Sequence, residues 1–423
     1  MRAPEAPQTT PDFWSDETAA VLYRRTWWIV GLLFLATVLN YLDRQVLALT
    51  AEQVMAEFRI SKEEFGRIIS AFRYAYAIFQ IIGGWLVDSR GPVTVFPAAV
   101  GLWSLAGILT SLSGSIRSLS ILRSLLGVGE SFNWPCALKV TQRLLPPKDR
   151  ALANGIFNSG AAAGAIIAPL IVTVVALYLG WRYAFVVTGA LGLLWIMAWL
   201  WLIPPFRPRL GGAPMSFRKV LDVFGRVLRK RSFWLLSVSA VIVNSVSYFL
   251  ADWIPLYLKT ERGFSFAVGN ALSVIVYASL EAGNILVGLF IRKLVARGVS
   301  VSRARRLALL ASCLLMSSAA AAGLTPNRFL AVGFLMLTAL GVAGFLVVYL
   351  TLVQDVEPEY VGATAGLLGG IGNLAYGSIS PLIGRLADLE QTTLTFVLIS
   401  LLPWLAFAAI FFVAREDKGT QGT

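Results

Sequence analysis

Long apolar segments recur along the whole chain and are separated by short polar stretches. A helix needs about 20 mostly apolar residues to cross about 30 Å of hydrocarbon, and it satisfies its own backbone hydrogen bonds. Membrane strands would be ~10-residue segments of alternating polarity, a pattern that the sequence does not show. The sequence therefore predicts an all-α membrane protein with about twelve spans, at residues 27–49, 65–87, 93–112, 119–140, 151–179, 183–203, 233–258, 266–291, 307–323, 329–350, 362–386 and 393–413.

Positive charge is concentrated in alternate loops between these segments. The N-terminal stretch and the loops near residues 90, 143–150, 207–231 and 292–306 are rich in Lys and Arg, whereas the intervening loops hold few. By the positive-inside rule, both termini are expected in the cytoplasm, with the protein in the inner (plasma) membrane. The basic run at 226–231 is interpreted as a surface for anionic lipid, and we expect no nucleic-acid partner.

An internal repeat relates the two halves of the chain. The segment PPKDRALANGIFNSGAAAGAIIAPLI, from Pro146, resembles EPEYVGATAGLLGGIGNLAYGSISPLI, from Glu357. The aligned pairs are Pro147 with Pro358, Gly155 with Gly366 and, after one inserted residue, Pro169 with Pro381. We expect two pseudo-symmetric six-helix halves at 27–203 and 233–413, a cytoplasmic linker at 204–232, and cytoplasmic tails at 1–26 and 414–423.

Several ionisable residues lie inside the predicted spans. A charge in hydrocarbon is costly, so each of them is a candidate functional group. Because the chain contains no histidine, carboxylates are the groups expected to carry protons within the membrane. The candidates are Asp43, Arg44, Arg73, Arg123, Glu130, Asp252, Glu281 and Arg385.

The span at 119–140 presents a cation and an acid on one helical face. Arg123, Gly127 and Glu130 follow one another at i, i+4 and i+7. Burial and a neighbouring arginine act on a carboxyl group in opposite directions, so Glu130 is a candidate proton carrier. A permanent structural pair of Arg123 with Glu130 is the alternative. Asp43 and Arg44 point about 100° apart on their helix, so one can face a cavity while the other contacts a neighbouring helix.

Two groups of motifs carry a resemblance to known families. The segment 83-GGWLVDSRG-91 resembles the G-x-x-x-D-x-x-G loop of the major facilitator superfamily, although Pro92 and Val93 replace the basic pair that usually follows. More narrowly, 40-NYLDR-44, 70-SAFRYAYAIFQIIGGWLVD-88, 123-RSLLGVGE-130, the PPKDRALANGIFNSG segment and 253-WIPLYL-258 resemble the anion:cation symporter family. That family includes bacterial sugar-acid transporters and sialin-type relatives.

The resemblance implies a transporter of small organic anions coupled to protons, working by alternating access. Asp43 and Glu130 would carry the protons. The expected substrate-binding residues are Tyr41, Arg44, Arg73, Tyr76, Arg123, Asn158, Ser159 and Asn373. For Asn158, Ser159 and Asn373, hydrogen bonds between helices are the alternative.

Arg73 departs from the sugar-acid members, which generally have a small or aromatic residue there. If its side chain faces the cavity, Arg73 would favour a substrate with two negative charges. If it does not, Arg73 would pair with Asp43 or Asp252. Glu281 is interpreted as a further proton site or as a partner of Arg73, and Asp252 is expected at the membrane interface.

Four charged residues are predicted to serve as gates. Asp88 and Arg90 follow the second span, and Arg385 and Asp388 are expected at the cytoplasmic end of the eleventh. Snorkelling towards headgroups is the alternative for Arg385 and Asp388.

Other functions remain as alternatives. An exporter of metabolites or drugs by proton antiport is the second hypothesis, and a non-transporting sensor that kept the fold is a third. An enzyme is not expected, because the chain offers no catalytic set of side chains. We expect no cofactor and no metal; the partners are the organic anion, protons and membrane lipids, and the protein is expected to be a monomer.

Overall fold

The computed structural model describes residues 17–212, 217–356 and 361–420, and every regular element in these ranges is helical. Each of the twelve expected spans is present as one long helix or as two consecutive helices. The spanning elements are α1 (Glu17–Leu49), α3 (Lys62–Arg90), α4 (Pro92–Thr110), α5 (Ile116–Glu130) with α6 (Asn133–Leu144), α7 (Pro147–Tyr178), α8 (Trp181–Leu202), α11 (Arg231–Asp252) with α12 (Ile254–Thr260), α13 (Phe266–Ala296), α14 (Val301–Met316) with α15 (Ser318–Leu324), α16 (Arg328–Val356), α17 (Val361–Asp388) and α18 (Thr392–Thr420). The shorter elements are α2 (Ala51–Phe58), η1 (Pro204–Phe206), α9 (Arg207–Leu210) and α10 (Phe217–Leu228).

Apolarity is not equal among the spans. Within the described ranges, nine helical segments are long and apolar enough to cross a membrane by themselves. The remaining spans are α3, the pair α5 and α6, and α17. These three also supply polar residues of the protein interior, including Arg73, Arg123, Glu130 and Asn373. The three spans with the weakest hydropathy signal therefore carry several of the interior charges, while Asp43 and Asp252 lie on spans that meet the criterion.

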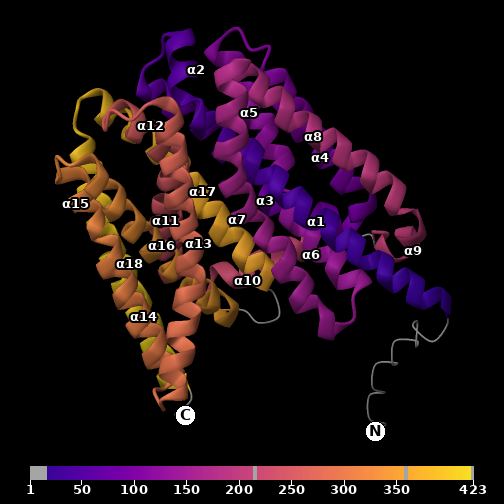
Figure 1. Ribbon diagram of the computed structural model, residues 1–423. Helices are drawn as coiled ribbons and strands as arrows, with labels where there is room; N and C mark the ends of the chain where they lie inside the picture. The colour runs from indigo at the N-terminus through magenta and orange to yellow at the C-terminus, as the bar shows by residue number, and fades with distance from the viewer. Residues whose placement is uncertain (1–16, 213–216, 357–360, 421–423) are drawn as a thin grey trace.

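The helices form two bundles, α1 to α8 and α11 to α18, that lean towards each other (Figure 1). The bundles approach at the end that carries α2 and α12, and they diverge towards the end that carries α9 and α10 (Figure 1). We call these the α2/α12 end and the α9/α10 end. Contact between the bundles is made chiefly by α3 with α17 and by α7 with α13.

Small residues allow α3 and α17 to pack backbone to backbone. A Cβ atom added to Gly66 would lie 2.6 Å from the carbonyl oxygen of Ser380, and one added to Gly384 would lie even closer to the carbonyl oxygen of Lys62. Glycine at such crossings removes the side chain that would hold two membrane helices apart. The two helices that carry the sequence repeat, α7 and α17, each contain an internal proline, whereas Pro358 lies outside the described residues.

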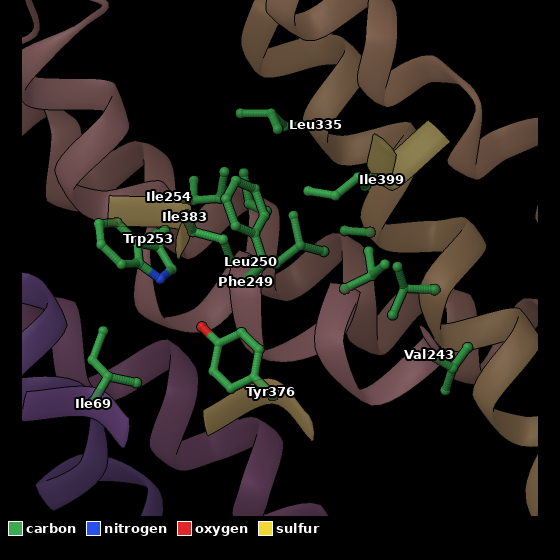
Figure 2. Close-up of a cluster of buried hydrophobic side chains, with 14 of the residues drawn as sticks. Ile69, Val243, Phe249, Leu250, Trp253, Ile254, Leu335, Tyr376, Ile383 and Ile399 are labelled. Atoms are coloured by element: carbon green, nitrogen blue, oxygen red, sulfur yellow. The ribbon is translucent and has the colours of Figure 1, made fainter. Parts of the chain in front are cut away.

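An apolar cluster joins the bundles near the α2/α12 end. Figure 2 shows Phe249, Leu250 and Trp253 beside Tyr376 of α17, with Ile69 of α3 nearby. A further ring contact crosses between the halves, since Phe65 and Trp253 meet edge to face with their centroids 5.7 Å apart. Burial of these side chains stabilises the contact of the two bundles at this end.

Candidate functional site

A small cavity lies between the bundles, and charged side chains form much of its wall. It is lined by Arg44, Leu47, Ala48, Phe65, Ile69, Phe72, Arg73, Arg123 and Asp252. These residues come from α1, α3, α5 and α11, so both halves contribute. The free space accepts little more than one water-sized sphere. In this conformation the cavity is closed around its own side chains and must widen to hold an organic ligand.

Arg44 forms an ion pair with Glu130. Its Nη2 lies 2.8 Å and its Nε 3.0 Å from Glu130 Oε2, and Nη2 also donates to Asn40 Oδ1 at 3.3 Å. The other carboxylate oxygen of Glu130 is buried and has no hydrogen-bond partner. The alternative that Arg123 and Glu130 form a permanent pair is therefore wrong, because α1 places a different arginine against this acid.

Aromatic rings surround the Arg44 guanidinium. Its central carbon lies 5.1 Å from the centroid of Tyr41, 5.3 Å from that of Phe72 and 5.0 Å from that of Tyr76. Ring faces attract a cation that has lost its water. Tyr41 and Tyr76 thus lie where substrate-binding residues were expected, next to Arg44, while Phe72 is a neighbour that the sequence did not single out.

Arg123 is the cavity arginine that has no ion pair within the described part of the chain. Its side chain is almost fully buried, and its Nε and Nη1 have no hydrogen-bond partner. The guanidinium carbon lies 5.0 Å from the centroid of Phe72. A buried guanidinium with free donors is costly until an anion reaches it.

Arg73 faces the cavity and also pairs with Asp252. Its Nη2 lies 2.8 Å from Asp252 Oδ2, its Nη1 is 3.4 Å from Asn373 Oδ1, and its guanidinium carbon is 3.7 Å from the centroid of Tyr248. Asp252 is 8% exposed and is therefore buried within the protein, while its expected position at the membrane interface stays a prediction. Asp252 lies at the end of α11, where the packing of α3 and α17 covers it.

Glu281 does not pair with Arg73. Its carboxylate accepts instead a hydrogen bond from Asn284 Nδ2 at 3.1 Å on the same helix, α13. The interpretation of Glu281 as a partner of Arg73 is therefore wrong.

Asp43 lies beside Arg44 in sequence but does not line the cavity. It is buried, and neither carboxylate oxygen accepts a hydrogen bond. The neighbouring hydroxyl of Thr188 on α8 donates to the carbonyl of Phe185 instead. Asp43 and Arg44 thus point to different surroundings, as adjacent residues on a helix do.

Asn158, Ser159 and Asn373 differ in position. Asn158 and Ser159 are exposed on α7 and do not line the cavity, and Ser159 Oγ donates to the carbonyl of Ile156 at 2.7 Å. Asn373 is buried beside Arg73, and its Nδ2 donates to Tyr248 Oη at 3.2 Å. Of these three amide and hydroxyl residues, the structure brings only Asn373 to the charged cluster.

The predicted gate residues divide between the two ends. Asp388 accepts hydrogen bonds from the backbone N–H groups of Lys62 at 3.0 Å and Glu63 at 2.9 Å, the first amides of α3. Asp88, at the other end of α3, pairs with Lys139 of α6. The expectation that Arg385 and Asp388 lie at the same end as Asp88 is therefore wrong, because α17 runs antiparallel to α3.

Two of the predicted gate residues, Arg90 and Arg385, are exposed and take part in no ion pair among the described residues. The sequence analysis missed Lys139, which is the partner of Asp88. Lys139 lies within the span predicted at 119–140, so the rule that flags intramembrane charges would have found it. Tyr248 has no comparable signal, because an aromatic residue in an apolar helix is unremarkable until its neighbours are known.

A family model described as Major Facilitator Superfamily matches residues 33–377. The hexuronate transporter of Escherichia coli (strain K12) is 28% identical over 413 residues, covering 93% of this chain and 95% of that protein. The probable galactarate/D-glucarate transporter of the same strain is 28% identical, covering 92% and 95%. The D-galactonate transporter of Escherichia coli O6:H1 is 27% identical, covering 86% and 90%.

Solved structures agree in fold. A bacterial homologue of the human lysosomal transporter Spinster, inward-facing and unoccupied, matches with a TM-score of 0.77 at 21% identity, covering 92% of this chain and 97% of that one. A D-xylose–proton symporter matches with a TM-score of 0.72 at 16% identity, covering 90% and 96%. At such identities the agreement concerns the twelve-helix, two-bundle architecture and not the cargo.

Proposed function

Since the chain belongs to the major facilitator superfamily, a family of membrane transporters and not of enzymes, we propose that it is a secondary active transporter that takes up a small sugar acid together with protons. Curated relatives that cover nearly the whole chain carry the names of hexuronate, galactarate/D-glucarate and galactonate transporters. Each of these cargoes is a six-carbon chain with hydroxyl groups and at least one carboxylate.

The unpaired guanidinium of Arg123 is the observation that supports an anionic cargo best. It is buried at a cavity between the two halves, and two of its donor nitrogens have no partner. The planar guanidinium fork matches the two oxygens of a carboxylate. Tyr41, Tyr76 and Asn373 lie near the other two arginines and can donate to or accept from sugar hydroxyls.

Asp43 and Glu130 are the proton carriers in this proposal. Both are buried, and three of their four carboxylate oxygens have no hydrogen-bond partner. A buried carboxylate without partners is costly in its charged form, whereas the protonated acid is neutral. Proton binding to Glu130 would weaken its hold on Arg44 and leave that guanidinium available to the substrate.

The membrane potential sets how many protons the uptake of an anion requires. An inside-negative potential opposes the entry of an anion by ~2.3 kcal/mol per charge per 100 mV. Uphill uptake therefore needs at least as many protons as the substrate has negative charges, and two buried acids meet this need.

Alternating access supplies the route. With both termini in the cytoplasm, the α2/α12 end faces outwards, and the described conformation is the one closed to the outside. The contacts of Asp388 with the start of α3 would open when the halves rock to the other state. Asp88 and Lys139, at the α9/α10 end, both belong to the first half, so their ion pair would persist in both states.

Uptake by proteoliposomes under an imposed pH gradient tests the proposal. D-Glucuronate, D-galactonate and galactarate are offered, with empty liposomes as the control. Uptake should accelerate when the interior is alkaline and should stop when a protonophore is added. Uptake that ignores the gradient would refute proton coupling, and acceleration by an acidic interior would indicate antiport instead.

A further inference from the structure

The three cavity arginines gather around one aromatic ring. The guanidinium carbons of Arg44, Arg73 and Arg123 lie 5.3, 5.4 and 5.0 Å from the centroid of Phe72. Any two of these carbons are therefore within roughly twice that distance of each other. Such a cluster of cations in a buried site needs anions to balance it.

Two protein carboxylates balance two of the three cations, and they do so in different ways. Glu130 and Arg44 belong to α5 and α1, which are helices of the same half. Asp252 and Arg73 belong to α11 and α3, which are helices of opposite halves. When the halves rock as units, the first pair can stay intact, whereas the second pair must open as its helices separate.

Other contacts between the halves surround the Arg73–Asp252 pair and would open with it. Tyr277 Oη donates to Gln45 Oε1 at 3.1 Å, and Ser70 Oγ donates to the carbonyl of Gly377. Opening of the α2/α12 end then leaves Arg73 without its carboxylate, while Arg123 has none in either case. Opening would thus leave the guanidinium groups of Arg73 and Arg123 unbalanced, whatever the protonation state of Glu130.

We propose that the site selects substrates with two carboxylates, one bound by Arg123 and the other by Arg73, and that Asp252 replaces the second carboxylate when the α2/α12 end closes. The proposal rests on the anion transport proposed above and adds the charge of the cargo. A dianion meets both free cations in the outward-open state. On closure Asp252 competes for Arg73, which weakens the hold on the dianion and favours its release to the other side.

Galactarate and D-galactonate form a matched pair of probes, because they differ only at one end of the same six-carbon chain. The test compares their uptake by wild-type protein and by Arg73→Gln in proteoliposomes. For galactarate, KM should rise roughly tenfold or more in Arg73→Gln, as expected for the loss of a hydrogen bond between charged groups. For D-galactonate, KM should change less than about twofold.

Arg67→Gln is the matched control. Arg67 lies on the same helix but is exposed and pairs with Glu63 at 2.7 Å, away from the cavity. It should leave KM unchanged for both acids. If Arg73→Gln raises KM equally for both acids, Arg73 does not bind the second carboxylate and the proposal is wrong. If wild-type protein transports only D-galactonate, the dianion proposal fails while proton-coupled sugar-acid uptake stands. If it moves neither of these acids nor D-glucuronate, both proposals fail.

Asp252→Asn tests the competition. The substitution frees Arg73 in the closed state, so purified protein should bind galactarate several-fold more tightly, with D-galactonate unaffected. The double variant Arg73→Gln/Asp252→Asn removes one positive and one negative charge and so leaves the net charge of the interior unchanged, which controls for misfolding caused by an unpaired arginine. It should bind the two acids with similar affinity. Unchanged or weaker galactarate binding in folded Asp252→Asn would overturn the role of Asp252.

Discussion

Arg44 and Glu130 are joined by an ion pair of 2.8 Å that links α1 to α5 inside the first half, and their side chains are 10% and 0% exposed. Because both helices belong to one half, this pair does not depend on how the two halves are placed. Glu130 can therefore gain or lose a proton in any conformation. The pair thus suits the coupling of proton binding to substrate binding better than it suits a gate between the halves.

Replacing Glu130 by Gln should abolish uphill uptake while exchange of substrate across the membrane is partly retained. The amide keeps the shape of the side chain but binds no proton, so coupling is lost before binding is lost. Uptake under a pH gradient and counterflow without a gradient measure the two activities. Glu63→Gln, at a partly exposed acid of α3 outside the cavity, is the control. Equal loss of both activities in Glu130→Gln would indicate a purely structural pair.

Replacing Arg123 by Gln should raise KM for every sugar acid tested by about tenfold to a hundredfold. The neutral amide cannot supply the charge-assisted bonds that hold a carboxylate, which are worth about 1.5–3 kcal/mol. Arg117→Gln, at an exposed arginine on the same helix, should leave KM unchanged. Unaltered KM in Arg123→Gln would place the substrate carboxylate elsewhere.

Replacing Gly66 by Ala should slow transport and lower the thermal stability of the purified protein. The new methyl group would lie 2.6 Å from the carbonyl oxygen of Ser380, so α3 and α17 must move apart at a cost of about 1–3 kcal/mol. Gly84→Ala is the matched control on the same helix, because no atom of another helix lies within 4 Å of its Cβ position. Identical melting temperatures and rates for the two variants would show that the helices do not pack this closely.

Replacing Glu57 by Gln should cost about 0–1 kcal/mol, because the pair is partly exposed. Arg182 Nη2 lies 2.6 Å from Glu57 Oε1 on α2 and lowers the pKa of that carboxyl. A hydrogen bond donated by Trp181 Nε1 to Glu57 Oε2 lowers the same pKa. A lowered pKa in the folded state contributes stability above the ordinary glutamate pKa of about 4.3, and this contribution is lost as pH falls through the folded value.

Thermal unfolding at a series of pH values measures this contribution. The gap between wild type and Glu57→Gln should be constant from about pH 8 to pH 5 and should shrink below about pH 4. Glu52→Gln, at an exposed acid of the same helix, should show no gap. A gap for Glu57→Gln that widens on acidification would contradict the assignment.

Much of the fold was predictable because hydrocarbon imposes a length and a polarity on every span. The predicted range at 119–140 corresponds to α5 and α6, yet the break at Ser131 and Phe132 was not expected. Hydropathy is averaged over many residues and does not show where a helix is interrupted. The same reason explains the missed breaks at Trp253 and at Ser317.

The three arginines of the candidate site were predictable, whereas their partners and the ring of Phe72 between them were not. Arg123 and Glu130 share a face of one helix, but seven residues separate them by about 10 Å along the axis, too far for an ion pair. Arg44 reaches Glu130 because its long side chain extends from α1 to the last residue of α5. Asp388 was placed at the wrong end because its helix was followed in the wrong direction across the membrane.

The sequence alone determines the number and length of the spans, the repeat of the two halves and the set of charges that must be buried. These depend on local composition and on the cost of a charge in hydrocarbon. The tertiary structure alone decided that Glu130 meets Arg44, that Asp252 of the other half meets Arg73, and that Arg123 has no ion pair among the described residues. The rotation and height of each packed helix set these partners, and neither is encoded in the composition of a single span.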